Sequence, residues 1–486
     1  MLTEGTTSMR VSGRFVIALM LVLLLAISLL LLLPAPADAV WNVQAVHTKA
    51  TRNGVSIAVD SGSNPHICFI ASETGNYYYE GSYIPTPKFL TYANWNGSSW
   101  NIQTVDPEGT SSVTIGYSSL VLDSDGAPQI VYSTTVPVNQ TESAYALKYA
   151  TLKETEWAIQ TIDYGARGTI EIDSKNNPHI AYIGVNGELK YTSWTGTNWN
   201  LQTVDPDPKN NSSETENYFI QDSDLTLDSD DQPNIIYWLT YTTPIEPGVY
   251  YPEGPRTVSI IKWARMDSSG WSTRTVILDA NVSRLGNAVL DSRGYPHFTY
   301  NNGWNHSLMY ESWNGNAWIG QKVTTIRDGY AGFLSLDHKN DPYITHCKEG
   351  WEENGTHISA IYYTQWKNPI WWNDAAWDSQ IIEADHTQGY SEKYSGSYTL
   401  PLVLDSKGNP HTIYLLLRES FIPTVYYSHP LQDATVVYAT SNQSAQTLQG
   451  EVKFALLTFL LVLAFGLLLA VAYYRKRRSS KGDRQE

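Results

Sequence analysis

The sequence predicts an all-β fold, a seven-bladed β-propeller of four-stranded antiparallel blades, followed by one C-terminal transmembrane helix. Three observations carry this prediction: a turn phrase that occurs seven times, side chains that alternate at period two within each repeat, and an uncharged apolar run near the C-terminus. Successive copies of the phrase lie 46 to 68 residues apart, a length typical of one propeller blade. The phrase reads "LDSDGAPQIVY" at Leu122, and its other copies begin at Val59, Ile172, Leu227, Leu290, Leu336 and Leu404.

The first element along the chain is an apolar segment at residues 15–33, "FVIALMLVLLLAISLLLLL". It follows two arginines and precedes an A-x-A cleavage pattern that ends at Ala39. This arrangement predicts a secretory signal peptide over residues 1–39. Because the apolar run is long for a signal peptide, an uncleaved signal anchor is the alternative.

The second element, residues 40–430, is the predicted propeller ectodomain. Its fullest repeat, residues 168–205, divides at turn residues into four short alternating runs, "TIEID", "HIAYI", "LKYTSW" and "WNLQTV". Four antiparallel strands per repeat, arranged radially, make a propeller blade. The phrase itself forms the tight link between the first two strands, because Asp and Ser bond nearby amides and Gly or Asn accepts a positive φ. The structural turn aspartates are Asp60, Asp123, Asp173, Asp228, Asp291, Asp337 and Asp405.

Two of these turns, "DSDGAP" and "DSDDQP", have the acidic composition of calcium loops. An EF-hand loop needs further ligands and a bidentate acid at its twelfth position, and none follows here. We therefore predict turn chemistry, no metal site and no cofactor, with a bound cation in one of the loops as the alternative. Histidines after the repeat proline occupy equivalent positions of different blades, which a ring holds apart. We predict structural roles for His66, His179, His297 and His411.

The last repeat is incomplete, because no "WxxQTV" strand follows "TVYYSHP" at residues 424–430. A matching segment is present at the other end of the chain. "WNVQAV" at residues 41–46 matches "WNIQTV" at 100–105 and "WNLQTV" at 199–204. We therefore predict that residues 41–46 form the outer strand of blade seven and so close the ring, which removes its open edges. The segment "DATVVYAT", from Asp433, is the alternative for that place.

The remaining elements are a stalk at residues 431–453, a transmembrane helix at 454–474 and a basic cytoplasmic tail at 475–486. The span carries no charge and is long enough to cross about 30 Å of hydrocarbon as a helix. The "RKRR" run from Arg475 marks the cytoplasmic side. The sequence thus predicts a single-pass cell-membrane protein with an external N-terminal ectodomain, or a two-pass protein if the signal is uncleaved.

Composition restricts the class of partner. The net charge is −16 although the tail is basic, so the external part is strongly acidic and repels nucleic acid. Cys68 and Cys347 sit at different offsets from the repeat proline, so we predict two buried thiols rather than a disulfide. Eight N-x-S/T sequons permit glycosylation, and all fall in the external part: Asn96, Asn139, Asn210, Asn211, Asn281, Asn305, Asn354 and Asn442.

Links between the second and third strands and between blades carry nearly all of the variable length, whereas the other links are short. A uniform frame with variable loops places recognition in the loops. These loops are rich in tyrosine, which gives rigid contact area with a polar tip. Packing of the same side chains onto the ring is the alternative. The candidate ligand-binding residues are Tyr77, Tyr78, Tyr79, Tyr83, Trp238, Tyr250, Tyr251, Tyr390, Tyr394 and Tyr398.

The repeat "LDSxGxPHIxY … LxYxxWxGxxW" resembles those of secreted β-propellers in archaeal and bacterial surface proteins, over nearly all of residues 41–430. It is more distantly similar to the propellers of sialidases and their Asp-box relatives. An Asp-box has the order S-x-D-x-G-x-x-W, whereas Asp precedes Ser here. "SYIPTP" and "SFIPTV" both lack the arginine of the sialidase F/Y-R-I-P start, so no catalytic residue is carried over.

These observations favour a membrane-anchored cell-surface module that binds an extracellular glycan or protein, because the sequence offers loops and aromatic residues but no convergent reactive group. We therefore predict no enzymatic activity. A glycan-acting, sialidase-like enzyme and a structural component of the cell envelope are the alternatives. Such an enzyme needs two carboxyl groups about 5 to 9 Å apart, and acids such as Glu383 and Asp385 are too common here to single out.

Overall fold

A computed structural model describes most of the chain between residues 41 and 441. The described ranges are 41–50, 54–72, 77–79, 82–84, 87–107, 115–137, 143–205, 218–242, 257–278, 281–325, 332–351, 356–367, 376–388, 400–420 and 431–441. Within them, the side chains of residues 77–79, 82–84, 242, 349–351, 356–359, 384–388, 416–420 and 431–435 are not described. The predicted signal segment, transmembrane helix and tail lie outside these ranges. In the described part of the chain, no helix is long and apolar enough to span a membrane.

The regular elements in these ranges are all β-strands, which confirms the predicted all-β class. The first half of the chain contains β1 (Trp41–Ala50), β2 (Ser56–Val59), β3 (Pro65–Ser72), β4 (Tyr77–Tyr79), β5 (Ser82–Ile84), β6 (Lys88–Trp95), β7 (Trp100–Asp106), β8 (Ile115–Leu122), β9 (Pro128–Pro137), β10 (Ser143–Lys153), β11 (Glu156–Ile172), β12 (Pro178–Gly184), β13 (Leu189–Trp194) and β14 (Trp199–Asp205). The second half contains β15 (Tyr218–Leu227), β16 (Pro233–Thr242), β17 (Thr257–Asp267), β18 (Gly270–Leu278), β19 (Val282–Leu290), β20 (Pro296–Asn302), β21 (Ser307–Trp313), β22 (Trp318–Thr325), β23 (Phe333–Leu336), β24 (Pro342–Trp351), β25 (Thr356–Lys367), β26 (Ala376–Gln388), β27 (Leu402–Leu404), β28 (Pro410–Ser420) and β29 (Leu431–Ser441).

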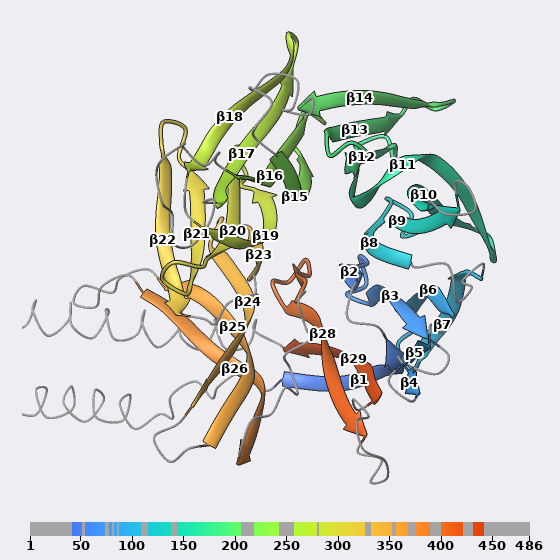
Figure 1. Cartoon of the computed structure of the whole chain (residues 1–486), viewed down its shortest axis with the longest axis vertical. Coiled ribbons are helices and arrows are strands. Elements are labelled where there is room, and N and C mark those ends of the chain that lie inside the picture. Colours follow the sequence, from blue (N-terminus) through green and yellow to red (C-terminus); the bar gives the residue numbers. More distant parts are fainter. Residues whose placement is uncertain are drawn as a thin grey trace, which may run out of the picture. The chain divides into compact units, whose positions relative to one another are not determined.

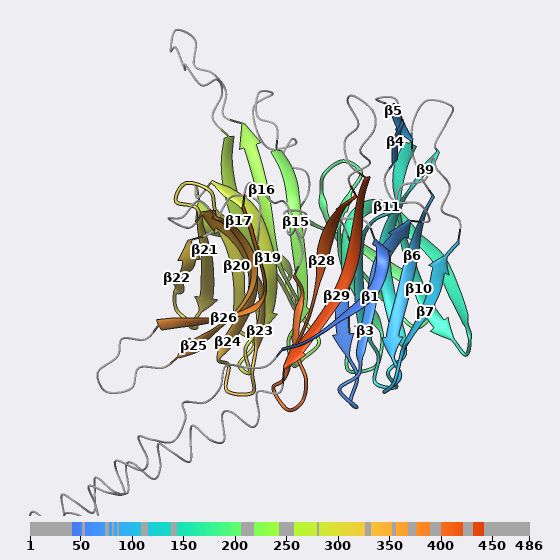
Figure 2. The ribbon, with the colours of Figure 1, turned by 90° about the horizontal axis from the view of Figure 1, so that it is seen from below.

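These strands pair into antiparallel sheets that lie around a common centre (Figure 1). Three sheets have four strands each, in the orders β15-β16-β17-β18, β19-β20-β21-β22 and β23-β24-β25-β26. In these groups the first strand lies nearest the centre and the fourth lies outermost (Figure 1). The strands run between two ends, with the short turns after each first strand at one end (Figure 2). Several four-stranded antiparallel sheets arranged in this way are consistent with a propeller.

A seven-stranded sheet joins two further groups through the long strand β11. The first part of β11 pairs with β10 as far as Tyr164, and the second part pairs with β12 from Gly165 onward. A Cβ atom on Gly165 would lie 2.6 Å from the carbonyl oxygen of Ile183, so the crossing point needs glycine. The strand therefore ends one four-stranded group, β8-β9-β10-β11, and begins the next, β11-β12-β13-β14.

The eight-stranded sheet brings the two ends of the sheet unit together. Strand β1 pairs with β29 from Trp41 opposite Ser441 to Ala50 opposite Ala434, which confirms the predicted pairing of the N-terminal "WNVQAV" strand with the last group. The group has the order β27-β28-β29-β1, and a single pair, Ala50 with Ala71, connects it to the group β2-β3-β6-β7.

One predicted boundary is wrong at this place. Leu431–Ser441, which we assigned to the stalk, form β29 and pair with β28 as the third strand of the last group. The compact unit accordingly runs from Trp41 to Ser441 rather than ending at residue 430. The physical reason is that β29 pairs with β28, the second strand of this group. A side-chain contact supports this pairing, because the hydroxyl of Tyr438 on β29 lies 2.7 Å from Nδ1 of His411 on β28. The "TVYYSHP" segment that we assigned to the third strand lies outside the described residues.

The repeat aspartates build the turns that follow the first strands. In each turn, one carboxylate oxygen accepts the N–H groups two and four residues later, as Asp60 does from Gly62 and Asn64, each at 2.8 Å. The third residue after the aspartate has a positive φ, as Asn176 does at 65°. Glycine, Asn, Asp and Ser tolerate this conformation best, and these four types occupy the position: Ser63, Gly126, Asn176, Asp231, Gly294, Asn340 and Gly408.

Tryptophans at the start of the fourth strands hold neighbouring groups together. Each one packs against an aromatic ring on the third strand of the preceding group, and the ring centroids lie 5.2 to 5.8 Å apart. Edge-to-face pairs of this kind stabilise by about 0.5–1.5 kcal/mol beyond the area that they bury. The pairs are Trp41–Tyr363, Trp100–Tyr438, Trp157–Tyr92, Trp199–Tyr149, Trp271–Tyr191, Trp318–Trp263 and Trp377–Tyr310.

Candidate functional site

Most of the predicted loop aromatics fall outside the described side chains. Tyr77, Tyr78, Tyr79 and Tyr83 lie on the small β4–β5 hairpin, of which only the backbone is described. Trp238 lies on β16 rather than in a loop, and it packs against the buried cluster around Phe298 and Tyr300. The structure therefore gives Trp238 a packing role. The remaining candidates lie outside the described residues: Tyr250, Tyr251, Tyr390, Tyr394 and Tyr398.

Three of the predicted glycosylation asparagines are described, and all three are exposed: Asn96, Asn281 and Asn305. The other five lie outside the described residues: Asn139, Asn210, Asn211, Asn354 and Asn442. The two cysteines, Cys68 and Cys347, are both buried and no disulfide joins them, as predicted. Burial raises the pKa of the Cys68 thiol to about 12, so this thiol stays protonated and unreactive.

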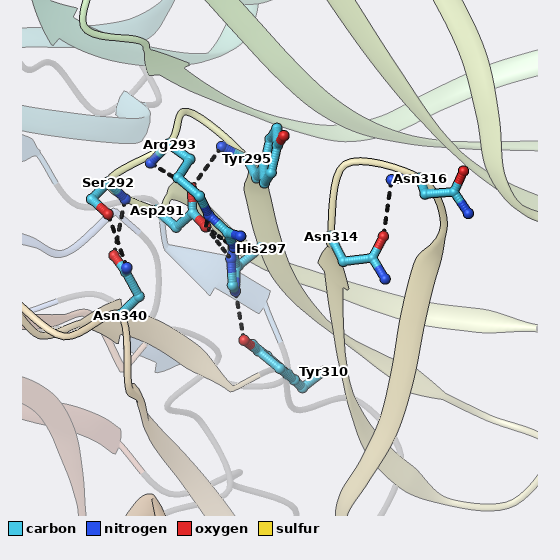
Figure 3. Close-up of polar contacts among 9 residues, drawn as sticks. All are labelled: Asp291, Ser292, Arg293, Tyr295, His297, Tyr310, Asn314, Asn316 and Asn340. Atoms are coloured by element: carbon cyan, nitrogen blue, oxygen red, sulfur yellow. Dashed lines mark hydrogen bonds and ion pairs between the residues drawn. The ribbon is translucent and has the colours of Figure 1, made fainter.

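An Asp–His–Tyr arrangement that superficially matches a catalytic relay occurs in several groups, and Figure 3 shows the one formed by Asp291, His297 and Tyr310. Nδ1 of His297 lies 2.5 Å from the hydroxyl of Tyr310, and Nε2 lies 3.8 Å from the carboxylate of Asp291. Burial lowers the pKa of His297 and outweighs the attraction of Asp291, so the ring stays neutral near pH 7. The same contacts recur at His66, His179 and His411. Its repetition in successive groups indicates a structural role, because one reaction needs only one such relay.

A second repeated arrangement ties neighbouring groups with ion pairs. Asp163, on the fourth-strand part of β11, accepts from the hydroxyl of Tyr182 at 2.6 Å and from the ammonium of Lys190 at 2.5 Å, both on the next group. Each such tie, which we call a Tyr–Asp–Lys latch, joins the fourth strand of one group to the second and third strands of the next. The other latches are Tyr132–Asp106–Lys148 and Tyr237–Asp205–Lys262.

Polar side chains also join the innermost strands to one another. The N–H of Leu120 on β8 donates to Oγ of Ser56 on β2 at 3.1 Å, and the N–H of Ala288 on β19 donates to Oδ2 of Asp224 on β15 at 2.7 Å. Both acceptors lie four residues before a turn aspartate. They satisfy backbone donors on the inner edge of the sheet, where no further strand pairs. Asp224 therefore has a structural role.

The repeats differ at the start of the innermost strands, six residues before the turn aspartate. Three successive groups place chemically different side chains there: Tyr117 on β8, Arg167 on β11 and Asp222 on β15. The guanidinium of Arg167 lies 4.4 Å from the centroid of the Tyr117 ring, and its Nη1 lies 4.0 Å from Oδ2 of Asp222. Arg284 on β19 acts on the same carboxylate. We call Tyr117, Arg167, Asp222 and Arg284 the inner-strand site.

The distances set this site apart from the latches. The latch ammonium groups lie 2.5 to 3.0 Å from their carboxylates, whereas Arg167 lies 4.0 Å from Asp222. Among the described residues, the Arg167 guanidinium makes no hydrogen bond. Its side chain is 29% exposed and that of Asp222 is 28% exposed. Oδ1 of Asp222 accepts the N–H of Ser223 at 3.1 Å, whereas the N–H groups of Arg167 have no acceptor among the described residues.

Two acids lie beside the inner-strand site. Burial raises the pKa of Glu171 to about 8, and repulsion from Asp224 adds to the effect. Burial also raises the pKa of Asp224 to about 7, although its hydrogen bond from the Ala288 N–H opposes the shift. The pKa of Asp222 is raised by burial as well, and the charges of Arg167 and Arg284 limit that shift. Perturbed acids of this kind cluster at functional sites more often than elsewhere.

None of these residues was singled out from the sequence. The available signal was the presence of charge in strands expected to line the centre: "RGTIEID" holds Arg167 and Glu171, and "QDSDLTLD" holds Asp222 and Asp224. A charge on a strand that is covered on both faces must be satisfied or functional. Comparing the repeats position by position shows which of these charges are unique to one group.

Comparisons with known proteins give only distant structural similarities. No known family profile and no curated protein sequence matches the chain. Among solved structures, the polysaccharide lyase Uly1 aligns with a TM-score of 0.48 at 9% identity, over 80% of this chain and 90% of the lyase. NanB sialidase from Streptococcus pneumoniae aligns with 0.39 at 11% identity, over 82% and 70%. The Aleuria aurantia lectin aligns with 0.34 at 10% identity, over 66% and 96%. These scores lie below 0.5, so the propeller-like fold rests on the strand pairing of this chain.

Proposed function

We propose that the protein is a membrane-anchored, cell-surface β-propeller of seven blades that binds an extracellular glycan through the inner-strand site. The blade count is supported by the seven tryptophan contacts, because each joins neighbouring four-stranded groups and the contact of Trp100 with Tyr438 joins the first group to the last. Anchoring is supported by the apolar run at residues 454–474 and the basic tail that follows it.

One observation carries the binding function: Arg167 lies between an aromatic ring and a carboxylate without a hydrogen bond to any described residue. Sugars are recognised by charged side chains that bond adjacent hydroxyls and by aromatic rings that contact the apolar ring face. The site lies at the ends of the inner strands that face away from the short turns, on the side where the variable loops emerge. Loops on that side would complete the pocket around the ligand.

Glycan binding should depend on Arg167 and not on a matched arginine elsewhere. We expect Arg167→Ala to reduce the affinity of the full-length protein for its glycan by about 1.5–3 kcal/mol, the range for hydrogen bonds to a charged group. Arg293→Ala is the control, since Arg293 is exposed in a short turn and contacts Asp291. The measurement is binding of the detergent-solubilised protein to an immobilised glycan panel. Equal loss in both variants, or binding only to protein ligands, would reject the assignment.

The loop side should face away from the membrane. Trp41 pairs with Ser441, and Thr440 pairs with His411 beside the turn at residues 405–409, so both ends of the sheet unit lie at the short-turn end. The chain leads from Ser441 toward the predicted span. We expect epitope tags at Asn76 and Gly248 to bind antibody on intact cells and a tag at Gly408 to be hindered. Equal or reversed accessibility in correctly folded protein would refute this orientation.

A glycan-acting enzyme is the second candidate, because a carboxyl group with a pKa of about 8, as in Glu171, suits a general acid. We propose binding instead, because the enzyme would need a second carboxyl group. The nearby Asp224 already has a structural role, since it accepts the Ala288 N–H at 2.7 Å. We expect no hydrolysis of sialosides or aryl glycosides by the purified protein. Turnover that Glu171→Gln abolishes and the exposed control Glu156→Gln preserves would establish the enzyme.

A further inference from the structure

The link between β20 and β21 exposes a tryptophan at its tip, on the loop side of the sheet unit. The side chain of Trp304 is 64% exposed. The backbone N–H of Trp304 donates to Oδ1 of Asn302 at 3.0 Å, which fixes the backbone of the link. No hydrogen bond, aromatic ring or cation among the described residues engages the indole. A single exposed apolar side chain is common on protein surfaces, so the tryptophan alone does not define a site.

A glycosylation acceptor from a neighbouring segment lies against the same link. Asn281 begins the sequon "NVS" at residues 281–283, directly before β19, and it is exposed. Its carbonyl oxygen accepts the N–H of Gly303 at 2.9 Å. Its amide lies over the same glycine, because a Cβ atom on Gly303 would be 3.0 Å from Nδ2 of Asn281. Gly303 directly precedes Trp304, so the acceptor nitrogen and the exposed indole belong to one small surface.

We propose that Asn281 carries an N-linked glycan and that the first sugars of this glycan cover the indole of Trp304. The proposal does not involve the inner-strand site, but it rests on the proposed external location of the sheet unit. In the modification, Nδ2 of Asn281 loses a proton and bonds to the anomeric carbon of a lipid-linked oligosaccharide. The bond from that carbon to the lipid phosphate breaks, and the phosphate leaves with the electron pair. A sugar ring offers an apolar face to the indole and hydroxyl groups to water, so this arrangement removes apolar area from solvent.

Two acceptors lie at this tip, and the arrangement favours the first. Asn305 is in the same link as Trp304, and its carbonyl oxygen accepts the hydroxyl of Ser307 at 3.1 Å. Asn281 precedes Asn305 in the chain, so it is presented first to an enzyme that acts during export. A glycan on Asn281 then crowds Asn305, because Asn281 contacts Gly303, two residues before Asn305. We therefore expect modification at Asn281 and little at Asn305.

Ser283 allows the glycan to be removed without disturbing the strands. The sequon requires a hydroxyl at this position. The fold does not use that hydroxyl, because Oγ of Ser283 is buried and has no hydrogen-bond partner among the described residues. Ser283→Ala therefore removes the acceptor signal and keeps the contact between Asn281 and Gly303. Ser283→Thr is the matched control, since it keeps the signal.

The experiment uses the full-length protein, made in cells that N-glycosylate exported proteins. Peptide mass spectrometry measures the occupancy of each sequon, and hydroxyl-radical oxidation of the folded protein measures the exposure of Trp304. We expect a glycan on Asn281 in the wild type and in Ser283→Thr, and several-fold slower oxidation of Trp304 in these two proteins than in Ser283→Ala. Tyr164, which is 51% exposed on β11, should oxidise at the same rate in all three.

Each other outcome counts against the proposal. An unmodified Asn281 in a protein that carries a glycan on Asn96 or Asn305 would overturn it. Equal oxidation of Trp304 in the wild type and in Ser283→Ala would also overturn it, since the glycan would then not cover the ring. If no sequon is modified although the loop tags bind antibody on intact cells, the proposal fails and the external location stands. If antibody does not reach the tags, the external location fails and the proposal fails with it.

A second variant keeps the test decisive if Ser283→Ala does not fold. Asn281→Asp keeps the shape of the side chain and removes the acceptor nitrogen. It should show the same fast oxidation of Trp304. Thermal unfolding of each variant checks that the sheet unit is intact.

Discussion

Deletion of residues 41–50 from the full-length chain is expected to lower the free energy of unfolding of the sheet unit by several kcal/mol or to cause aggregation. Strand β1 pairs with β29, and its loss exposes the backbone of that strand as a free edge. It also removes the buried side chains of Val46 and Ala50 and the contact between Trp41 and Tyr363. Thermal unfolding followed by tryptophan fluorescence measures the effect.

Point substitutions separate the contribution of side-chain packing from that of the backbone pairing between β1 and β29. Trp41→Ala should cost about 2 kcal/mol, since a large side chain that is only partly buried is truncated. Val43→Thr is the matched control, because Val43 is 40% exposed and its replacement keeps a β-branched side chain. An unchanged melting temperature in the deletion variant would show that β1 does not close the unit.

Glu171→Gln is expected to stabilise the protein at alkaline pH and to have little effect at acidic pH. The folded-state pKa of Glu171 is about 8, above the ordinary value of 4.5. The folded state therefore holds a proton that the unfolded state releases, so the contribution of Glu171 to stability is greatest below about pH 4.5 and is lost as pH rises through 8. The full shift corresponds to about 5 kcal/mol. We expect about 3 kcal/mol, since partial solvent access reduces the cost of ionisation.

The comparison must be the difference between variant and wild type at each pH. The buried histidines act in the opposite direction, because burial lowers the pKa of His66, His179, His297 and His411 and their contribution is lost as pH falls below about 6.5. Subtracting the two unfolding curves cancels those terms. Glu156→Gln, at the exposed first residue of β11, is the control for the loss of a surface carboxylate. A Glu171→Gln difference that does not change with pH would mean that Glu171 ionises normally.

Sequence repetition made the frame predictable. The aspartate turns, the alternating strands and the match of "WNVQAV" to the other fourth strands all recur, so each copy supports the assignment of the next. The third strand of the last group was misassigned because its segment lacks the "WxGxxW" hairpin that is present at residues 95–100, 194–199 and 313–318. Its selection depends on a tertiary contact, between His411 and Tyr438, that only the folded sheet reveals.

The inner-strand site could not be predicted in the same way. Tyr117, Arg167 and Asp222 are separated by about fifty residues each, and no local pattern connects them. They come together because each lies six residues before its turn aspartate and the ring places equivalent positions of neighbouring groups side by side. The tyrosine-rich loops were chosen as candidates because their composition is unusual. The inner-strand site instead differs from the other repeats at one position of the first strand, six residues before the turn aspartate.

The central claim is that recognition occurs at the inner ends of the first strands. A structure of the protein with the glycan selected by the panel tests it most directly. We predict that the ligand lies within hydrogen-bonding distance of the Arg167 guanidinium and contacts Asp222. A ligand bound at the short turns or along the outer strands, with Arg167 left uncontacted, would contradict the claim.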